Sequence, residues 1–197
     1  RLRHALNNEE FRLVRLPITS MEDDDFLISE FESRMRVDGS DEIIMPATFR
    51  PAAVQSGLAT EVDRDLIQNL IRWLGNHPED KEDMLVPLSG QSLADDGFIV
   101  ELQGLVDDET ISGRRLILGF QETEVRESVR EFQRLIRRLG ARGVRFALLD
   151  VTPDAKVDLV LKNVDIAKAP KRKSKGKGKV PPKFRHPEDT SKTWTGR

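Results

Sequence analysis

Basic side chains are concentrated at the C-terminal end of the chain. Residues 168–197 contain eleven lysines and arginines but only two acidic residues, Glu188 and Asp189, which gives this segment a net charge of +9. Cationic side chains at this density neutralise phosphate groups along a nucleic-acid backbone, whatever the base sequence. The side chains from which we expect such contacts are Lys171, Arg172, Lys173, Lys175, Lys177 and Lys179.

The remainder of the chain is acidic. The whole chain carries a net charge of −2, so removing the +9 of the C-terminal segment leaves −11 on residues 1–167. An acidic body with a strongly basic end is typical of proteins that carry a nucleic-acid-binding arm. A lysine-rich end can also serve solubility alone.

The composition excludes several kinds of chemistry. The chain has no cysteine, which excludes disulfide bonds, thiolate metal sites and cysteine nucleophiles. His4, His77 and His186 lie in unrelated segments without metal-binding spacing, and we expect no cofactor. No apolar run approaches the roughly 20 residues needed to cross a bilayer, and the first residues lack the apolar stretch of a signal peptide. We therefore expect a soluble, cytoplasmic protein without membrane contact.

The body of the chain alternates between predicted strands and predicted helices. Residues 11–19, FRLVRLPIT, alternate apolar and polar side chains and are predicted as a strand, and residues 26–37 form a second one. A helix is predicted to start at Asp63, with Gly75 just beyond its end. Further strands are predicted at 84–89, 115–120 and 144–151 (the last one buried), and further helices at 93–106 and 124–139, ended by Gly140. This order indicates parallel strands with helices packed outside, in an open α/β sheet or a barrel.

The character of the sequence changes at Ala167. The run KAPKRKSKGKGKVPPK has almost no apolar side chains, so it cannot bury enough surface to offset the entropy of ordering the chain. We therefore predict a domain at residues 1–165, a flexible basic linker at 166–179 and a small separate segment at 180–197.

Four segments of the body carry a family resemblance: ALNNEEFRLVRLPI, FESRMRVDGSDEIIMPATFRPAAVQSGLATEVDR, VPLSGQSLADDGF and GVRFALLD. In their order and spacing they resemble the EAL-domain family of cyclic-di-GMP phosphodiesterases, which is built on a modified β/α barrel. The resemblance implies an α/β fold that forms a partial (β/α) barrel of the EAL type. The chain would supply about the first five strand–helix units.

The same resemblance implies where a catalytic site would lie. In that family, metal ions held by carboxylates and an amide oxygen activate a water that attacks the phosphodiester. The signature Glu-x-Leu-x-Arg keeps Glu32 and Arg36 but has Arg34 in place of leucine. Two further acidic positions are kept as Glu122 and Asp150. Arg34 and Arg36 can bind a phosphate bidentately, although a surface or salt-bridged role is the simpler interpretation for both.

Other positions of the family's site have changed. Pro87 stands where the family has a metal-binding asparagine, Gly119 where it has a glutamate, and Leu149 where it has the first of two paired aspartates. Leu16 stands where the family has a glutamine that contacts the nucleotide. Hard cations need several oxygen ligands in one cavity. The resemblance therefore implies a catalytically inactive homologue without a metal site.

The end of the chain carries a second resemblance. In VPPKFRHPEDTSKTWTGR, a Phe-Arg-x-Pro start is followed by Thr-Trp-Thr-Gly-Arg, which resembles the DNA-binding domain of the H-NS family of bacterial nucleoid proteins. The resemblance implies that Gly196 and Arg197 enter the narrow minor groove of AT-rich DNA, which attracts an extended arginine. Arg185 would add a DNA contact, and Phe184 and Trp194 would anchor the DNA-binding fold. The sequence ends before the second Gly-Arg of the family's motif.

Together these features predict a DNA-binding transcriptional regulator or nucleoid-associated protein, located on the nucleoid. Its inactive EAL-like domain would form a homo-oligomer or recruit a protein partner, because a partial barrel leaves sheet edges and apolar faces that need cover. The expected partner is AT-rich double-stranded DNA.

Two alternatives remain open. The first is a cyclic-di-GMP receptor that controls DNA binding, and Leu16 and Arg34 count against it. The second is an active phosphodiesterase, and Pro87, Gly119 and Leu149 count against that. We therefore expect cyclic-di-GMP binding to be weak or absent.

Overall fold

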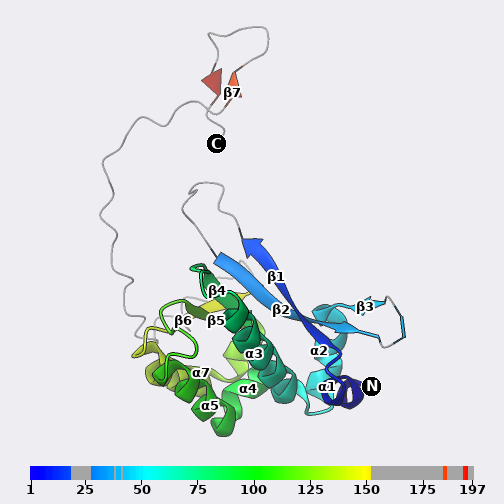
Figure 1. Cartoon of the computed structure of the whole chain (residues 1–197). Coiled ribbons are helices and arrows are strands. Elements are labelled where there is room, and N and C mark those ends of the chain that lie inside the picture. The colour runs from blue at the N-terminus through cyan, green and yellow to red at the C-terminus, as the bar shows by residue number, and fades with distance from the viewer. Residues whose placement is uncertain (19–27, 38, 41, 152–183, 186–192, 195–197) are drawn as a thin grey trace. The chain divides into compact units, whose positions relative to one another are not determined.

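The computed structural model describes residues 1–18, 28–37, 39–40, 42–151, 184–185 and 193–194. The chain divides into two compact units, Arg1–Val164 and Asp165–Arg197. Figure 1 shows the first unit as a twisted sheet with helices packed along it.

A six-stranded sheet forms the centre of the first unit. Its strands are β1 (Phe11–Ile18), β2 (Ile28–Arg36), β3 (Ile43–Ile44), β4 (Asp83–Pro87), β5 (Leu116–Gln121) and β6 (Arg145–Leu149). The strand order is β1-β2-β4-β5-β6, and β3 pairs with β2. Strands β2, β4, β5 and β6 run parallel, whereas β1 and β3 are antiparallel to β2.

The pairing of β1 with β2 corrects the expectation of parallel strands throughout. The nine residues between them, 19–27, are too few for the crossover of a dozen or more residues that joins parallel neighbours. The two strands therefore pair directly and antiparallel, with Phe11 opposite Met35 and Ile18 opposite Ile28. The remaining strands follow the expected pattern because helices connect them, and the mixed α/β class is confirmed.

Helices cover one face of this sheet (Figure 1). The described helices are α1 (Leu2–Asn7), α2 (Pro46–Gln55), α3 (Ala59–Asn76), α4 (Gly90–Ala94), α5 (Asp96–Asp107), α6 (Glu122–Glu127) and α7 (Val129–Gly140). The core between sheet and helices includes Phe31, Met84, Val86, Leu118 and Phe120 from the strands and Leu66, Leu102 and Leu135 from the helices. Each such buried side chain stabilises the fold by roughly 1.5–3 kcal/mol relative to exposure.

Helix α3 begins earlier and ends later than predicted. The sequence predicted its start at Asp63, but α3 begins at Ala59, and Gly75 lies inside the helix. Asp63 is buried instead, and its Oδ2 accepts hydrogen bonds from the backbone N–H of Ser89 and the hydroxyl of Ser92, both at 2.7 Å. The carboxylate thus connects α3 to the loop after β4 and to helix α4, and it is not needed at the helix start.

Each of the two later predicted helices is divided in two. Asp95 separates α4 from α5, and its side chain caps α5 by accepting a hydrogen bond from Phe98 N at 2.9 Å. Ser128, with φ −127° and ψ 43°, separates α6 from α7. Gly140 is the last residue of α7 and not the residue beyond it. The apolar spacing continues across both breaks, so the sequence pattern did not show them.

Three further elements differ from the sequence prediction. Strand β6 is exposed or partly exposed, and not buried as predicted, because among the described strands it lies last in the order and pairs only with β5. Helix α2 was not predicted, and it contains Pro51 in its interior. Helix α1 and the two-residue strand β3 were also missed, because they are too short to show a periodic pattern.

The second unit contains one described pairing. Strand β7 (Phe184–Arg185) pairs antiparallel with β8 (Thr193–Trp194), so Phe184 lies opposite Trp194. The predicted linker, its basic residues and the pair Gly196 and Arg197 lie outside the described residues. Among the helices that the structure describes, none is long and apolar enough to cross a membrane.

Candidate functional site

The C-terminal ends of the parallel strands meet at one edge of the sheet. In (β/α) barrels this edge carries the active site. Pro87 of β4 pairs with Gly119 of β5, and Leu149 of β6 pairs with Gln121, two residues further along β5. Glu32 lies on the neighbouring strand β2. The structure therefore gathers these sequence-predicted positions at one edge.

Successive residues of β2 point to opposite faces of the sheet. Ser29, Phe31, Ser33 and Met35 are buried, whereas the residues between them are half-buried. The half-buried set is Ile28, Glu30, Glu32 and Arg34. This second face would be the inside of a closed barrel. On it, Leu16 of β1 lies directly opposite Glu30, so an apolar side chain occupies the position where the family's glutamine was expected.

Glu32 is bound by an arginine of its own strand. The Nε of Arg34 donates to Glu32 Oε1 at 2.9 Å, and the two side chains are 27% and 14% exposed. They lie on the same face because they are two residues apart on β2. The guanidinium therefore neutralises the carboxylate at the position where the family would use it for a metal ion.

Two charged residues that the sequence analysis missed lie beside this pair. Burial raises the pKa of Glu30 above its usual range, and the nearby carboxylates of Glu32 and Asp150 raise it further, while Arg50 lowers it. Arg50 Nη2 donates to the carbonyl oxygen of Pro87 at 2.7 Å. The period-2 pattern of β2 could have revealed Glu30, but nothing in the sequence placed Arg50 of α2 at this edge.

Leucine side chains fill the space above Gly119. A Cβ atom built on Gly119 would lie 3.0 Å from Leu149 Cδ1 and 3.2 Å from Leu85 Cδ1. Both distances are shorter than ordinary contacts between carbon atoms. The position that holds a glutamate in the family is therefore closed by two apolar side chains, and one of them stands at another former ligand position.

The remaining acidic positions have different surroundings. Glu122 is the first residue of α6, is only 3% exposed and forms an ion pair with Arg126 one turn later. Asp150 follows β6, is exposed and has φ +51°, a left-handed conformation that aspartate tolerates better than most residues. Two of the kept carboxylates, Glu32 and Glu122, are thus paired with arginines of this chain.

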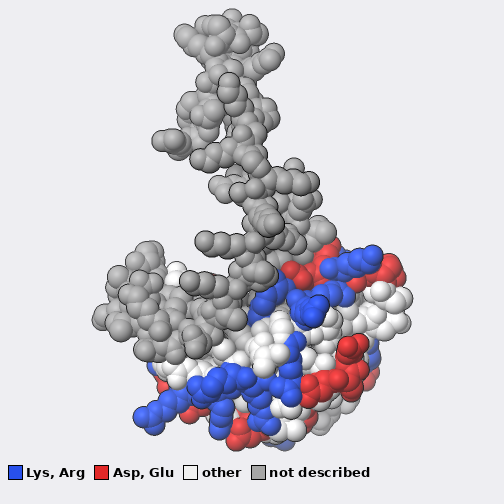
Figure 2. Space-filling model, turned by 90° about the vertical axis from the view of Figure 1, so that its left-hand side faces the viewer, with Lys and Arg blue, Asp and Glu red and all other residues white. Residues whose placement is uncertain are grey.

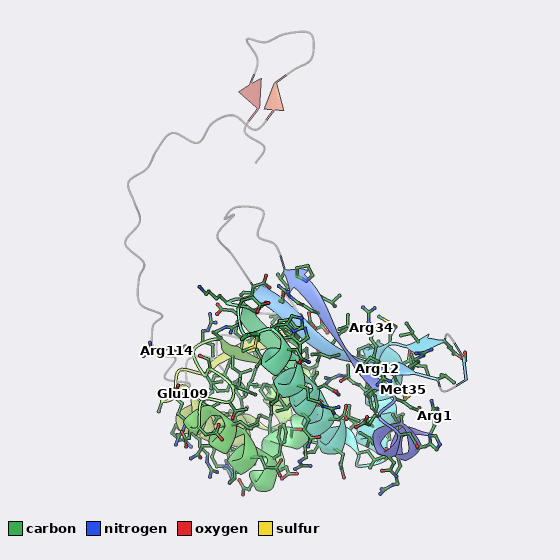
Figure 3. The ribbon with its side chains drawn as sticks, viewed as in Figure 1. Arg1, Arg12, Arg34, Met35, Glu109 and Arg114 are labelled. Carbon is green, nitrogen blue, oxygen red and sulfur yellow. The ribbon has the colours of Figure 1, made fainter. Side chains whose placement is uncertain are left out.

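Arginines gather at the end of β1 and β2 next to α1. Arg12 lies directly opposite Arg34 across the two strands, an arrangement of like charges that is unfavourable without a counter-charge. Figure 3 shows both side chains at this end of the sheet, with Arg1 nearby. A polar pocket of about 490 Å³ lies here, and its lining includes Arg12, Arg36 and Glu10.

The site does not fit the family's metal ions. Pro87 and Gly119 have no side-chain oxygen, and Leu149 has only carbon in its side chain. Within the described residues, no group of three or more histidine, cysteine, aspartate or glutamate side chains could hold a metal ion. A hard cation needs several oxygen ligands at once.

Comparison with known proteins identifies the first unit. The model of the EAL domain family matches residues 1–162. The chain belongs to the EAL domain family. Cyclic di-GMP phosphodiesterase PdeF of Escherichia coli is 28% identical over 170 residues, which cover 84% of this chain and 22% of PdeF. RNase E specificity factor CsrD of the same organism is 32% identical over 112 residues, which cover 56% of this chain and 17% of CsrD.

Solved structures of the family show the same fold. The FimX EAL domain from Pseudomonas aeruginosa, bound to c-di-GMP, superposes with a TM-score of 0.73 at 25% identity, covering 83% of this chain and 66% of the FimX chain. The c-di-GMP complex of the PaMucR phosphodiesterase superposes with a TM-score of 0.69 at 20% identity, covering 83% of this chain and 67% of that chain. The chain thus spans about a fifth of the curated relatives and about two thirds of these structures.

A second family model matches the end of the chain. The H-NS histone C-terminal domain matches residues 179–197, a segment of 19 residues that includes β7 and β8. Besides Lys179, it contains the sequence-predicted DNA contacts Arg185, Gly196 and Arg197, together with Trp194, which was predicted to anchor the DNA-binding fold.

Proposed function

We propose that this chain is a DNA-binding transcriptional regulator or nucleoid-associated protein whose EAL domain is catalytically inactive. The observation that carries the proposal is the succession of an EAL domain and an H-NS type C-terminal segment in one chain. The basic charge of residues 168–197 supports DNA as the partner, because it supplies the cations that phosphate backbones attract. The nucleoid is the corresponding location.

The geometry of the strand ends supports the loss of catalysis. Glu32 is neutralised by Arg34, and Gly119 is covered by Leu149 and Leu85. Pro87 supplies only its backbone carbonyl, which already accepts a hydrogen bond from the Arg50 side chain. Without a metal-bound water, the site lacks the nucleophile that the family's reaction requires.

The EAL domain then serves assembly, either with a second copy of the chain or with a partner protein. The strand order of the described sheet ends at β1 and β6, and each of these strands pairs with one neighbour only. Unpaired strand edges are sites at which another chain can add. An assembly through this domain would place several DNA-binding segments near one another and raise their joint affinity.

A cyclic-di-GMP receptor is the second candidate function. The FimX EAL domain, which this chain resembles over 83% of its length, is bound to c-di-GMP in its structure. This similarity favours nucleotide binding, and Leu16 and Arg34 count against it. Calorimetry with the intact protein decides whether the domain binds the nucleotide. Micromolar affinity for cyclic-di-GMP would make the receptor the leading function.

Removal of residues 180–197 tests the DNA-binding proposal. We expect the intact protein to bind an AT-rich duplex more tightly than a GC-rich duplex of equal length, and the shortened protein to bind both equally through the remaining lysines. A control with residues 180–197 in scrambled order keeps the charge but loses both motifs, and it should behave like the shortened protein. Equal preference in the scrambled and natural proteins would contradict the proposal.

A further inference from the structure

One stretch of the otherwise acidic EAL domain is strongly basic. Residues 126–145, which include α7, contain seven arginines and two glutamates, a net charge of +5. Removing this +5 from the −11 of residues 1–167 leaves −16 on the rest of the body. Because salt screens charges beyond about 8–10 Å, a ligand near α7 experiences mainly the charges close to it, which are these arginines and carboxylates of α5 such as Asp96 and Asp107.

The arginines of α7 form a row on its outer side. Arg130, Arg134 and Arg137 are exposed and follow one another at intervals of four and three residues, which places them on one face of the helix. The opposite face packs into the core through Phe132 and Leu135. Figure 2, which shows the side where α7 lies, has a band of Lys and Arg side chains across the lower part of the body.

The three arginines of this row are not held by strong ion pairs within the described part of the domain. Within the described residues, the structure records no ion pair or side-chain hydrogen bond for Arg130 or Arg137. Arg134 lies 3.2 Å from Asp96, but both side chains are largely exposed, and such surface pairs contribute little. By contrast, the neighbouring Arg142 is held by Asp107. Three guanidinium groups are therefore available to a ligand.

The spacing of the row matches a nucleic-acid backbone. Seven residues of α-helix rise about 10.5 Å between Arg130 and Arg137. One strand of duplex DNA presents a phosphate about every 3.4 Å along the helix axis, so the row faces about three phosphates. The row contains only arginine, whose weakly hydrated guanidinium fork binds phosphate oxygens in pairs.

We infer that the α7 row, Arg130, Arg134 and Arg137, is a second DNA-backbone contact on the EAL domain itself. This inference rests on the proposed DNA-binding function and adds a site to it. The C-terminal segment and the α7 row bind the same duplex, so the second contact is intramolecular and strengthens the first. The row contributes affinity without sequence preference, because it contacts phosphates and not base edges.

The test is the salt dependence of duplex binding by the intact protein, measured by fluorescence anisotropy on a GC-rich duplex. The variant carries Arg130→Gln and Arg137→Gln, since glutamine keeps the helix propensity of arginine. The control carries Arg3→Gln and Arg72→Gln, which remove the same charge from exposed positions of α1 and α3. Far-UV circular dichroism confirms that both variants are folded.

We expect the slope of the logarithm of the binding constant against the logarithm of the salt concentration to become about 1.8 less negative in the α7 variant. The variant loses two phosphate contacts, and each contributes about 0.9 to the slope. The control should keep the natural slope. If the α7 variant also keeps the natural slope, or if the control changes equally, the inference is wrong while the C-terminal segment can still bind DNA. If the natural protein binds no duplex at low salt, the proposed function fails as well.

Discussion

Gly119 lies beneath two leucine side chains at the C-terminal end of β5. Leu149 and Leu85 approach the place of its missing Cβ to 3.0 and 3.2 Å, so the two leucines and the glycine fit one another. Restoring an acidic side chain at Gly119 alone would therefore require both leucines to move. The absence of a side chain at this position and the apolar packing above it are thus coupled.

The first prediction follows from this contact. Gly119→Ala should destabilise the protein by about 1–3 kcal/mol, because the new methyl group overpacks the space between the two leucines. Gly75→Ala is the matched control, since nothing lies within 4 Å of its Cβ position in α3, and it should stabilise the helix by roughly 0.5–1 kcal/mol. Urea unfolding of both variants provides the measurement. An unchanged unfolding midpoint for Gly119→Ala would show that the leucines give way.

The second prediction concerns catalysis. The intact protein should not convert cyclic-di-GMP to its linear product with either Mg²⁺ or Mn²⁺, because Glu32 is bound to Arg34 and Pro87, Gly119 and Leu149 supply no side-chain oxygen. Chromatographic separation of the nucleotides after long incubation detects even slow turnover. Metal-dependent hydrolysis that disappears in Glu32→Ala would establish the active phosphodiesterase instead.

At the scale of elements, a polar network joins β1 and β2 to the residues before β4. Glu82 forms an ion pair with Arg15 and accepts a hydrogen bond from the Ser29 hydroxyl, and Arg15 also lies 3.5 Å from Asp80. The hydrogen bonds from Ser29 and Arg15 lower the pKa of Glu82 below its usual range. The contacts fix the start of β4 against the two antiparallel strands.

The third prediction is the pH dependence of this network. The pKa of Glu82 is lower in the folded than in the unfolded protein. Its ionised side chain therefore contributes fully to the free energy of unfolding above the unfolded pKa of about 4.3, and this contribution is lost as the pH falls through the folded pKa. Glu82→Gln should therefore destabilise the protein by about 1–2 kcal/mol at pH 7 and by less at pH 3. Denaturant titrations at both pH values measure the difference. A destabilisation that does not change with pH would refute the electrostatic explanation.

The sequence predicted the elements with strong periodicity and missed those set by tertiary contacts. The strands at β4 and β5 and the helix α3 follow from continuous apolar spacing, although their bounds shift by up to four residues. The break at Ser128 and the start of α3 at Ala59 depend on packing, which local propensity does not encode. The antiparallel pairing of β1 with β2 follows from the shortness of the loop between them, because nine residues cannot form the crossover of a parallel pair.

The candidate site was predicted as a set of positions but not as a set of contacts. The family resemblance placed Glu32, Pro87, Gly119 and Leu149 near one another, and the strand register agrees. It did not show that Arg34 turns to Glu32 along its own strand. Contacts between side chains depend on rotamers and on strand pairing, and residue identity alone does not fix them.

At the scale of the whole molecule, charge divides the chain into parts with different roles. Residues 168–197 carry +9 beside a body of −11. An acidic body repels DNA except where arginines gather, so duplex is directed to the basic segments. In the proposed function, the EAL domain contributes assembly and the C-terminal segment contributes the choice of DNA sequence.

The fourth prediction separates charge from sequence preference. Replacing Lys171, Lys173 and Lys175 by glutamine should weaken binding to AT-rich and GC-rich duplexes alike and make the salt slope about 2.7 less negative. The ratio of the two affinities should stay the same, since phosphate contacts carry no base information. Anisotropy titrations at several salt concentrations give both quantities. A changed ratio with an unchanged slope would assign the lysines to base recognition.

The most direct test of the central claim is the ratio of affinities for AT-rich and GC-rich duplexes, measured for the intact protein and for Arg197→Ala. The account predicts a clear preference for AT-rich DNA in the natural protein, because a narrow minor groove attracts the arginine, and a ratio close to one in Arg197→Ala. Lys175→Ala, which removes one charge from the same end of the chain, should leave the ratio unchanged. A natural protein without AT preference, or a preference that survives Arg197→Ala, would contradict the account.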